Sequence, residues 1–220
     1  MAYLIGVAGG SGSGKTTFAK KVLREFGPEV SILHMDSYYL PKPAAELKTL
    51  AGHPNFDHPN AFDWPLLREH LEILKQGLEV NVPVYDFKTS SRTSQFNPLG
   101  PSQVIICEGI FTLFDQEIRD LFDIKCFLYV DSDIRFIRRL HRDVQERGRS
   151  LESVICQYYD SVRPMYQKYL DPQRQYADFI VGEETDTAAS ILNAKVKEFL
   201  QTTTPLHSWQ SAQIKSHQHV

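Results

Sequence analysis

The chain has 220 residues, of which 42% are hydrophobic, and a formal net charge of −3. This length and composition predict one globular domain with a sizeable core, and the charge argues against a nucleic-acid partner. No apolar segment is long enough to cross a membrane as a helix. The three cysteines, Cys107, Cys126 and Cys156, are widely spaced and match no zinc-binding pattern, which predicts a reducing, cytoplasmic compartment.

The first pattern along the chain is a glycine-rich stretch over residues 9–16 that reads G-x-x-x-x-G-K-T. An apolar run over 3–8 predicts a strand before it, and the helical period over 15–26 predicts a helix after it. Main-chain N–H groups in such a loop donate hydrogen bonds to phosphate oxygens, whereas a flexible linker would lack a strand before it and a helix after it. The predicted ATP-binding residues are Gly9, Gly10, Ser11, Gly12, Ser13, Gly14, Lys15, Thr16 and Thr17.

Two further apolar runs each end in an acid. The run over 30–35 is followed by Asp36, and the run over 104–109 contains Glu108. Because ligands bind beyond the carboxyl ends of parallel strands, both acids are expected to face the phosphate loop. Asp36 is either a general base for an acceptor hydroxyl or a loop aspartate, and Glu108 is predicted to hold Mg²⁺ together with Thr16.

The middle of the chain predicts a pocket for a small molecule. Residues 55–64 combine two acids, a histidine and three aromatic side chains, which suits a ligand pocket or a surface loop pinned by aromatic contacts. A helix is predicted after Asp63. The alternation over 80–84 and the turn over 88–93 predict a β-hairpin insertion over about 80–97, whose aromatics either wall a pocket or pack the hairpin base.

An arginine-rich helix follows a strand predicted over 125–130. Its arginines and those just after it can clamp a transferring phosphoryl group, or can form a solvated face paired with Asp143 and Glu146. For Arg135 and Arg138 the solvated face is the favoured interpretation. The candidates for the clamp, in a lid over about 139–149, are Arg139, Arg142, Arg147 and Arg149.

The last third predicts a helix that starts at Ser150 and is kinked at Pro164, a strand over 176–182 and an amphipathic helix over 187–200. The tail over 202–220 is polar and is predicted to be disordered. Together the elements predict an α/β fold: three α/β/α layers around a mostly parallel five-stranded sheet, with the small hairpin at the acceptor site.

Seven motifs, in this order and spacing, resemble the uridine–cytidine kinase family of phosphate-loop nucleoside kinases. The resemblance runs from about residue 3 to 182. The motifs are Gly9–Thr16, Asp36–Tyr39, Asn55–Pro59, Val82–Phe87, Cys107–Ile110, Arg138–Asp143 and Glu146–Arg149.

The resemblance implies phosphoryl transfer from ATP, with Mg²⁺, to the 5′-hydroxyl of uridine, cytidine or both, in a kinase domain over 1–201. It implies catalytic roles for Asp36, Lys15, Arg142 and Arg147, metal binding by Thr16 and Glu108, and a further ATP contact from Arg149. The nucleoside-binding residues that it implies are Tyr39, Phe56, Asp57, Tyr85, Phe87, Ser90, Arg139, Arg149 and Gln157. It also implies a homo-oligomer, often a tetramer.

One position departs from the family pattern. Family members often carry a histidine where this chain has Ser90, so the choice of base stays open. Two other functions remain: a kinase for another hydroxylated metabolite, and a nucleotide-binding regulator without acceptor chemistry. A regulator would not need Asp36 or Asp57, and the guanine-reading pattern N-K-x-D is absent from the sequence.

Overall fold

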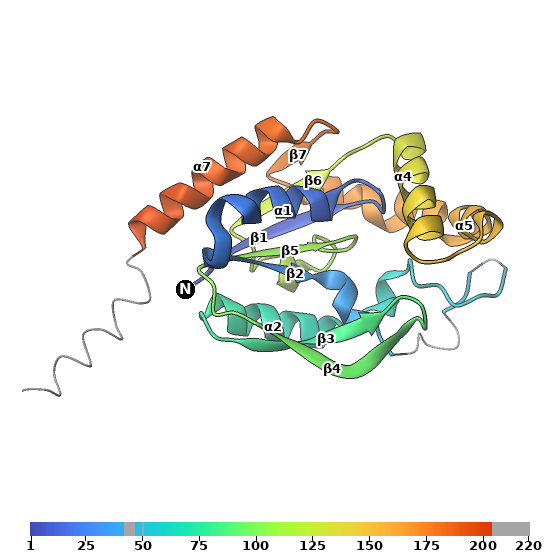
Figure 1. The fold of residues 1–220 in the computed structure, drawn as a ribbon, viewed down its shortest axis with the longest axis horizontal. Helices are drawn as coiled ribbons and strands as arrows, with labels where there is room; N and C mark the ends of the chain where they lie inside the picture. The colour runs from blue at the N-terminus through green and yellow to red at the C-terminus, as the bar shows by residue number, and fades with distance from the viewer. Residues whose placement is uncertain (42–46, 50, 204–220) are drawn as a thin grey trace, which may run out of the picture.

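The computed structural model describes residues 1–41, 47–49 and 51–203. Its centre is a five-stranded sheet in the order β2-β5-β1-β6-β7, with every neighbouring pair parallel (Figure 1). The predicted parallel sheet is therefore confirmed. Its strands are β1 (Tyr3–Gly9), β2 (Val30–His34), β5 (Val104–Gly109), β6 (Ile124–Leu128) and β7 (Phe179–Val181).

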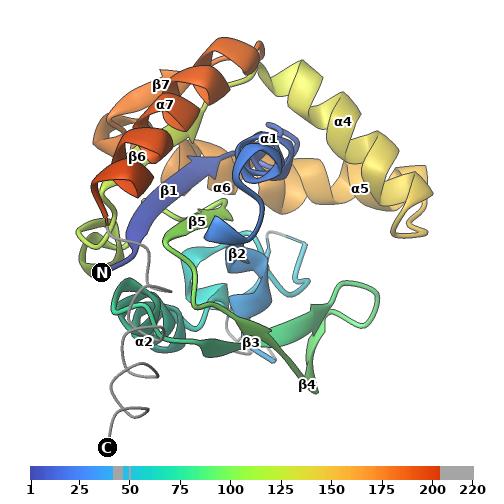
Figure 2. The same cartoon turned by 60° about the vertical axis from the view of Figure 1, so that its left-hand side comes forward.

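The two faces of the sheet carry separate hydrophobic clusters. One cluster packs helices α1 (Lys15–Phe26) and α7 (Asp186–Thr202) against the sheet, and the other packs α2 (Trp64–Lys75) and α3 (Gln116–Arg119) against the opposite face. Figure 2 shows α1 and α7 on one side of the strands and α2 on the other. The predicted three layers follow from this packing.

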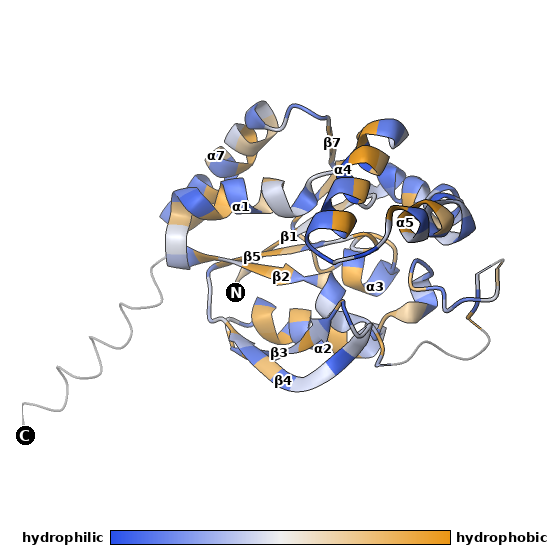
Figure 3. Cartoon of the chain, turned by 45° about the vertical axis from the view of Figure 1, so that its right-hand side comes forward, coloured by the Kyte–Doolittle hydropathy of each residue, from blue (hydrophilic) through white to orange (hydrophobic). Residues whose placement is uncertain are grey.

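The central strands are mostly apolar, as expected for strands that are covered on both faces. All of β5 is buried, and β1 lies between β5 and β6, with Leu4 opposite Ile105 in the register. Figure 3 shows the central strands largely orange, whereas the outer helices carry both colours. The carboxyl ends of these strands therefore meet at one edge, where the phosphate loop follows β1.

The predicted hairpin forms a separate antiparallel pair, β3 (Val80–Asp86) and β4 (Ser91–Leu99). It extends two residues beyond the predicted end at 97. A charged hydrogen bond ties it to the body of the protein: Nη1 of Arg92 donates to Oδ2 of Asp63 at 3.1 Å. Because Asp63 also caps α2 through the N–H of Leu66, the hairpin is anchored to the start of that helix.

The segment between β6 and β7 is mostly helical and lies at the carboxyl edge of the sheet. It contains α4 (Ser132–Gln145), α5 (Leu151–Gln157), a π-helical turn (Tyr158–Val162) and α6 (Arg163–Met165). A second π-helical turn (Tyr166–Leu170) and a 3₁₀ turn (Asp171–Tyr176) continue the same path. Pro164 lies in the first turn of α6, where its missing N–H is tolerated, so the chain stays helical past the predicted kink.

At the end of the described chain, α7 runs through Thr202, one residue into the segment predicted as tail; residues 204–220 lie outside the described ranges. None of the helices within those ranges combines the length and apolar character needed to span a membrane.

Candidate active site

The phosphate loop joins β1 to α1 as predicted. Gly12 has φ of +81°, in the left-handed region, and a Cβ there would lie 2.3 Å from the carbonyl oxygen of Arg135. Only glycine adopts this φ readily and also has no Cβ to collide with that oxygen. The Nζ atom of Lys15 donates to the carbonyl of Gly10 at 3.0 Å, so the lysine folds back over the loop. Burial lowers the pKa of Lys15, opposed by the charges of Glu108 and Asp36.

A carboxylate from the neighbouring strand closes the far side of the loop. The Thr16 hydroxyl donates to Oε1 of Glu108 at 2.9 Å, and Nδ1 of His34 lies 2.7 Å from the same oxygen. Burial would raise the pKa of Glu108, but the hydrogen bond from His34 and the charge of Lys15 outweigh it and lower the pKa. Glu108 is therefore a carboxylate at neutral pH.

Thr16 and Glu108 fit a magnesium ion held mainly by a nucleotide. Mg²⁺ prefers oxygen ligands and takes one or two protein carboxylates together with substrate phosphates and water. Within the described ranges no group of three or more His, Cys, Asp or Glu side chains forms a self-sufficient metal site. His34 was not foreseen, although its pairing with Glu108 in the register of β2 and β5 follows from the strand assignments.

Asp36 lies in a 3₁₀ turn, Met35–Tyr38, directly after β2. Burial raises its pKa, the charge of Glu108 raises it further, and the charges of Lys15 and Arg147 oppose the rise. Asp36 lines one cavity together with Ser11 of the phosphate loop. The structure thus brings Asp36 to the cavity that the phosphate loop borders, and its role as a general base stays a prediction.

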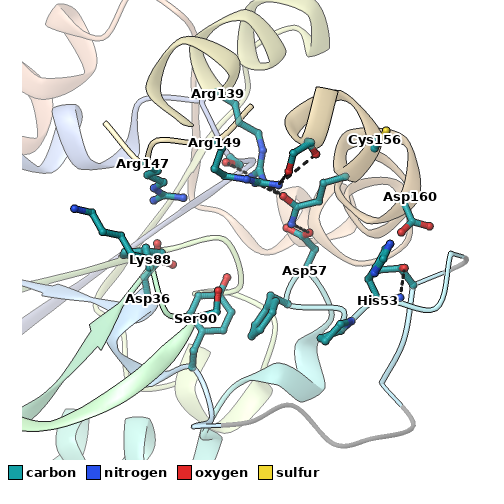
Figure 4. Close-up of a pocket in the computed structure, with 18 of the residues that line it drawn as sticks. Asp36, His53, Asp57, Lys88, Ser90, Arg139, Arg147, Arg149, Cys156 and Asp160 are labelled. Atoms are coloured by element: carbon teal, nitrogen blue, oxygen red, sulfur yellow. Dashed lines mark hydrogen bonds between the residues drawn. The ribbon is translucent and has the colours of Figure 1, made fainter. Parts of the chain in front are cut away.

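A cavity of about 1270 Å³ opens from the phosphate loop toward the hairpin and α5. Figure 4 shows Asp36, Lys88 and Arg147 at one end, His53 and Asp160 at the other, and Ser90 and Asp57 between them. The cavity brings together all the residues predicted to bind the nucleoside, and Asp36, Arg142 and Arg147 as well. The predicted nucleoside residues in its lining are Tyr39, Phe56, Asp57, Tyr85, Phe87, Ser90, Arg139, Arg149 and Gln157.

Aromatic side chains form one wall of this cavity. The ring of Tyr39 lies 6.1 Å from that of Phe56 and 5.1 Å from that of Tyr85, and Tyr85 lies 5.3 Å from Phe87, centroid to centroid. Two of these rings come from the hairpin. They line the cavity rather than only packing the hairpin base, so the pocket interpretation of these residues holds.

Asp57 also lines the cavity and is held by the helical segment. Its Oδ2 accepts a hydrogen bond from the Ser161 hydroxyl at 2.6 Å and from Nε2 of Gln157 at 3.4 Å. Ser161 belongs to the π-helical turn, a distortion that often occurs at functional sites. No sequence pattern pointed to Ser161, because π turns have no simple signature, and the rim residues His53, Cys156 and Asp160 were missed for the same lack of signal.

The four candidate clamp arginines surround one fully buried carboxylate, Asp143. All lie within 3.6 Å of its oxygens: Arg139, Arg142, Arg147 and Arg149. The guanidinium of Arg147 also lies over the ring of Phe87, 4.1 Å from its centroid, so the lid contacts the hairpin across the cavity. Nη1 of Arg139 donates to the Ser11 hydroxyl at 2.9 Å, which joins the lid to the phosphate loop.

The interpretation of Arg135 as a solvated residue is wrong. Its side chain is buried, its Nε donates to the carbonyl of Val130 at 2.9 Å, and its guanidinium stacks on Tyr166 at 3.8 Å. It packs under Gly10 and Gly12 of the phosphate loop. Helical period alone places Arg135 on a polar face, and only the tertiary contact with the loop buries it.

Arg138 does face solvent, as predicted. Its partner is Glu183, at 2.5 Å, rather than Asp143 or Glu146.

Comparison with known proteins agrees with this geometry. Residues 4–190 match the model of the "Phosphoribulokinase / Uridine kinase family". The chain belongs to this family. It is 44% identical to a uridine kinase of Deinococcus deserti, over 89% of this chain and 95% of that protein, and 47% identical to a uridine kinase of Lactobacillus johnsonii, over 90% and 96%. This family member is therefore a kinase enzyme.

Solved structures of similar fold include a D-glycerate 3-kinase from Cryptococcus neoformans, with a TM-score of 0.61. That protein is 18% identical, and the match covers 83% of this chain and 87% of that one. At this identity the likeness shows the fold alone. The phosphate-loop fold with its parallel sheet is thus shared with kinases whose acceptors differ, and the acceptor of this family member has to be argued from its own cavity.

Proposed function

We propose that this kinase transfers the γ-phosphoryl group of ATP to the 5′-hydroxyl of uridine or cytidine and forms the nucleoside monophosphate. One observation carries the proposal: the half-buried side chain of Asp36 lines the same cavity as Ser11 of the phosphate loop, Asp57 and the aromatic wall. The names of the relatives that are 44% and 47% identical over nearly the whole chain support a pyrimidine nucleoside as the acceptor.

In the proposed reaction the main-chain amides of residues 9–17 and Lys15 hold the nucleotide phosphates. Asp36 accepts the proton of the 5′-hydroxyl as that oxygen attacks the γ-phosphorus. Arg142 and Arg147 neutralise the charge that spreads over the transferring group, and Arg149 contacts the nucleotide. Mg²⁺, bound with ATP near Thr16 and Glu108, would neutralise charge on the phosphates.

Ribose recognition is assigned to Asp57 and Arg139. A carboxylate accepts hydrogen bonds from two vicinal hydroxyls, and Asp57 is already oriented by Ser161 and Gln157. A 2′-deoxy acceptor would leave part of this buried carboxylate without a partner, which costs about 1–3 kcal/mol. The base is expected to lie between the aromatic wall and Ser90, near Gln157 and Arg149.

The organisation of the protein follows from the same assignment. We infer one kinase domain over 1–201, in which the hairpin over about 80–97 and the arginine-rich lid over about 139–149 close on the acceptor, followed by a polar tail over 202–220. We further propose a cytoplasmic homo-oligomer, tetrameric as the resemblance implies. Light scattering of the purified full chain tests the subunit number.

A substrate panel tests the proposed function. ADP release is measured with uridine, cytidine and 2′-deoxyuridine, and with D-glycerate and ribulose 5-phosphate as acceptors for the rival kinase. We expect turnover with at least one pyrimidine ribonucleoside and ³¹P NMR detection of a 5′-monophosphate. Turnover with no ribonucleoside would overturn the proposal, and ATP binding without any acceptor turnover would favour the regulator.

A further inference from the structure

Asp143 is the carboxylate around which the arginine lid is built. It lies on α4, is fully buried, and contacts no group that the proposed reaction transforms. Its pKa is lowered: burial would raise it, but the charges of Arg139 and Arg142 outweigh that effect. A buried carboxylate among guanidinium groups is charged, and its own charge holds them in place.

The two oxygens of Asp143 face two different sets of arginines. Oδ1 accepts hydrogen bonds from Nε and Nη2 of Arg142, at 2.9 and 2.8 Å, and lies 3.4 Å from Nη1 of Arg147. Oδ2 lies 3.6 Å from Nε of Arg139 and 3.4 Å from Nη1 of Arg149. The first set is the pair assigned to the phosphoryl group. Both arginines of the second set reach Gln157 on the acceptor side, and Arg139 also contacts Ser11 of the phosphate loop.

We propose that Asp143 is a positioning residue that couples acceptor binding to phosphoryl transfer, because each of its oxygens orients one of these two arginine pairs. The inference rests on the proposed function. When an acceptor binds Arg139 and Arg149, it fixes the position of the Asp143 carboxylate. The same carboxylate orients Arg142 and Arg147. Four guanidinium charges around one carboxylate leave a net positive charge for the phosphates.

A competing explanation is that Asp143 only stabilises α4 and the turn at Gly148. The N–H of Arg149 donates to the carbonyl of Asp143 at 3.1 Å, a main-chain contact that any residue at 143 keeps. A purely structural role would lower stability when the carboxylate is changed and leave the kinetics of the folded enzyme alone. The two explanations are separated by measuring how the binding of one substrate changes the affinity for the other.

The experiment compares Asp143→Asn and Asp143→Glu with the wild type in the full chain. Asn keeps the shape but loses the charge and presents donors to the guanidinium groups; Glu keeps the charge but moves it by one methylene group. Glu184→Gln is the control, because Glu184 is an exposed acid outside the lid and outside the cavity lining. Circular dichroism confirms folding, and calorimetry measures the Kd of uridine with and without a non-hydrolysable ATP analogue.

For Asp143→Asn we expect kcat to fall about 100-fold, since misplaced catalytic groups cost about that much, and the Kd of uridine to rise about tenfold. The effect of the ATP analogue on uridine affinity should disappear. Asp143→Glu should have a kcat at least about fivefold below that of the wild type but above that of Asn, and Glu184→Gln should match wild type.

Three outcomes overturn the inference. One is a folded Asn or Glu variant whose kcat falls by less than about fivefold, the worth of one hydrogen bond; another is a folded variant with unchanged coupling. If the Asn variant does not fold, the kcat and the coupling of the Glu variant are judged by the same two criteria. The third outcome is that neither variant folds, which shows a structural role for Asp143. A wild type that phosphorylates no ribonucleoside refutes the proposed function instead.

Discussion

The phosphate half and the acceptor half of the cleft are built in different ways. The phosphate half is built around one continuous stretch, residues 9–16, whose main-chain amides are the proposed phosphate ligands and whose glycines at 10 and 12 meet steric limits set by Arg135. The acceptor half collects side chains from five separated regions: the turn after β2, the loop before α2, the hairpin, the lid and the segment from α5 into the π turn.

This difference separates phosphate binding, which kinases of similar fold can share, from acceptor recognition, which differs between them. Backbone amides recognise phosphate whatever the acceptor is, and similar folds occur in kinases with other acceptors. Side chains on a hairpin and a lid can change without disturbing the sheet. The two halves meet at Asp36, which follows the edge strand β2 and lines the acceptor cavity, so substitutions in each half should give separable effects.

The largest effect is expected at this meeting point. Replacing Asp36 by Asn removes the proposed base but keeps the size of the side chain, so kcat should fall about 1,000-fold, within the range for general-base catalysis. ATP affinity should hold, because Lys15 and the main-chain amides bind the phosphates. Steady-state kinetics and calorimetry with an ATP analogue measure the two effects. An unchanged kcat would refute the base assignment.

The second largest effect is expected from a change in the acceptor half alone. Replacing Asp57 by Ala should lower kcat/KM for the ribonucleoside about 100-fold, since hydrogen bonds to a charged group are worth roughly 1.5–3 kcal/mol each. The preference for ribose over 2′-deoxyribose should shrink at the same time, while the KM for ATP stays constant. A preserved preference for ribose would show that the hydroxyls are held elsewhere.

In the phosphate half, the expected effect comes from strain in the main chain of the phosphate loop. An alanine at Gly12 would need a strained φ of +81° and would place Cβ 2.3 Å from a main-chain oxygen, so we expect a loss of about 2 kcal/mol in the free energy of unfolding and weaker ATP binding. Gly182→Ala is the control, since Gly182 has open space around it. Chemical denaturation measures the free energy of unfolding of both variants. Equal values for the two variants would contradict the steric argument.

How much the sequence could predict follows the same division. The phosphate loop, the strands of the sheet and the acids after β2 and in β5 are local patterns, and their mutual arrangement follows from the rules for parallel sheets. The acceptor residues were found through family motifs rather than spacing. His34, Arg135 and Ser161 gained their positions through tertiary contacts with Glu108, the phosphate loop and Asp57, between segments 74 to 125 residues apart, which no local pattern encodes.

The pH dependence sharpens the role of Asp36. The proposed base acts as a carboxylate, and burial raises its pKa, so activity should be lost on acidification at a higher pH than the usual value of about 3.9 for aspartate. Below that pKa, kcat/KM for the nucleoside should fall about tenfold per pH unit. A pH–rate profile of the wild type measures this, and an acidic limb at or below the usual value would contradict the environment described for Asp36.

The smallest effect is expected at Ser90, which lines the cavity from the hairpin turn and has φ of +52°. Histidine tolerates this left-handed conformation better than most residues, so Ser90→His should fold. Its imidazole can make a hydrogen bond to the edge of the base that the shorter serine cannot reach. The ratio of kcat/KM for uridine to that for cytidine should therefore change about fivefold, the worth of one hydrogen bond.

Ser94→His is the matched control for this last variant, because Ser94 lies on the same hairpin but is exposed and outside the cavity lining. It should leave the ratio at the wild-type value. If Ser90→His also leaves it there, Ser90 does not face the base, and the base edge must lie toward Gln157 and Arg149. Discrimination would then come from α5 and the lid, and the hairpin would supply only the aromatic wall.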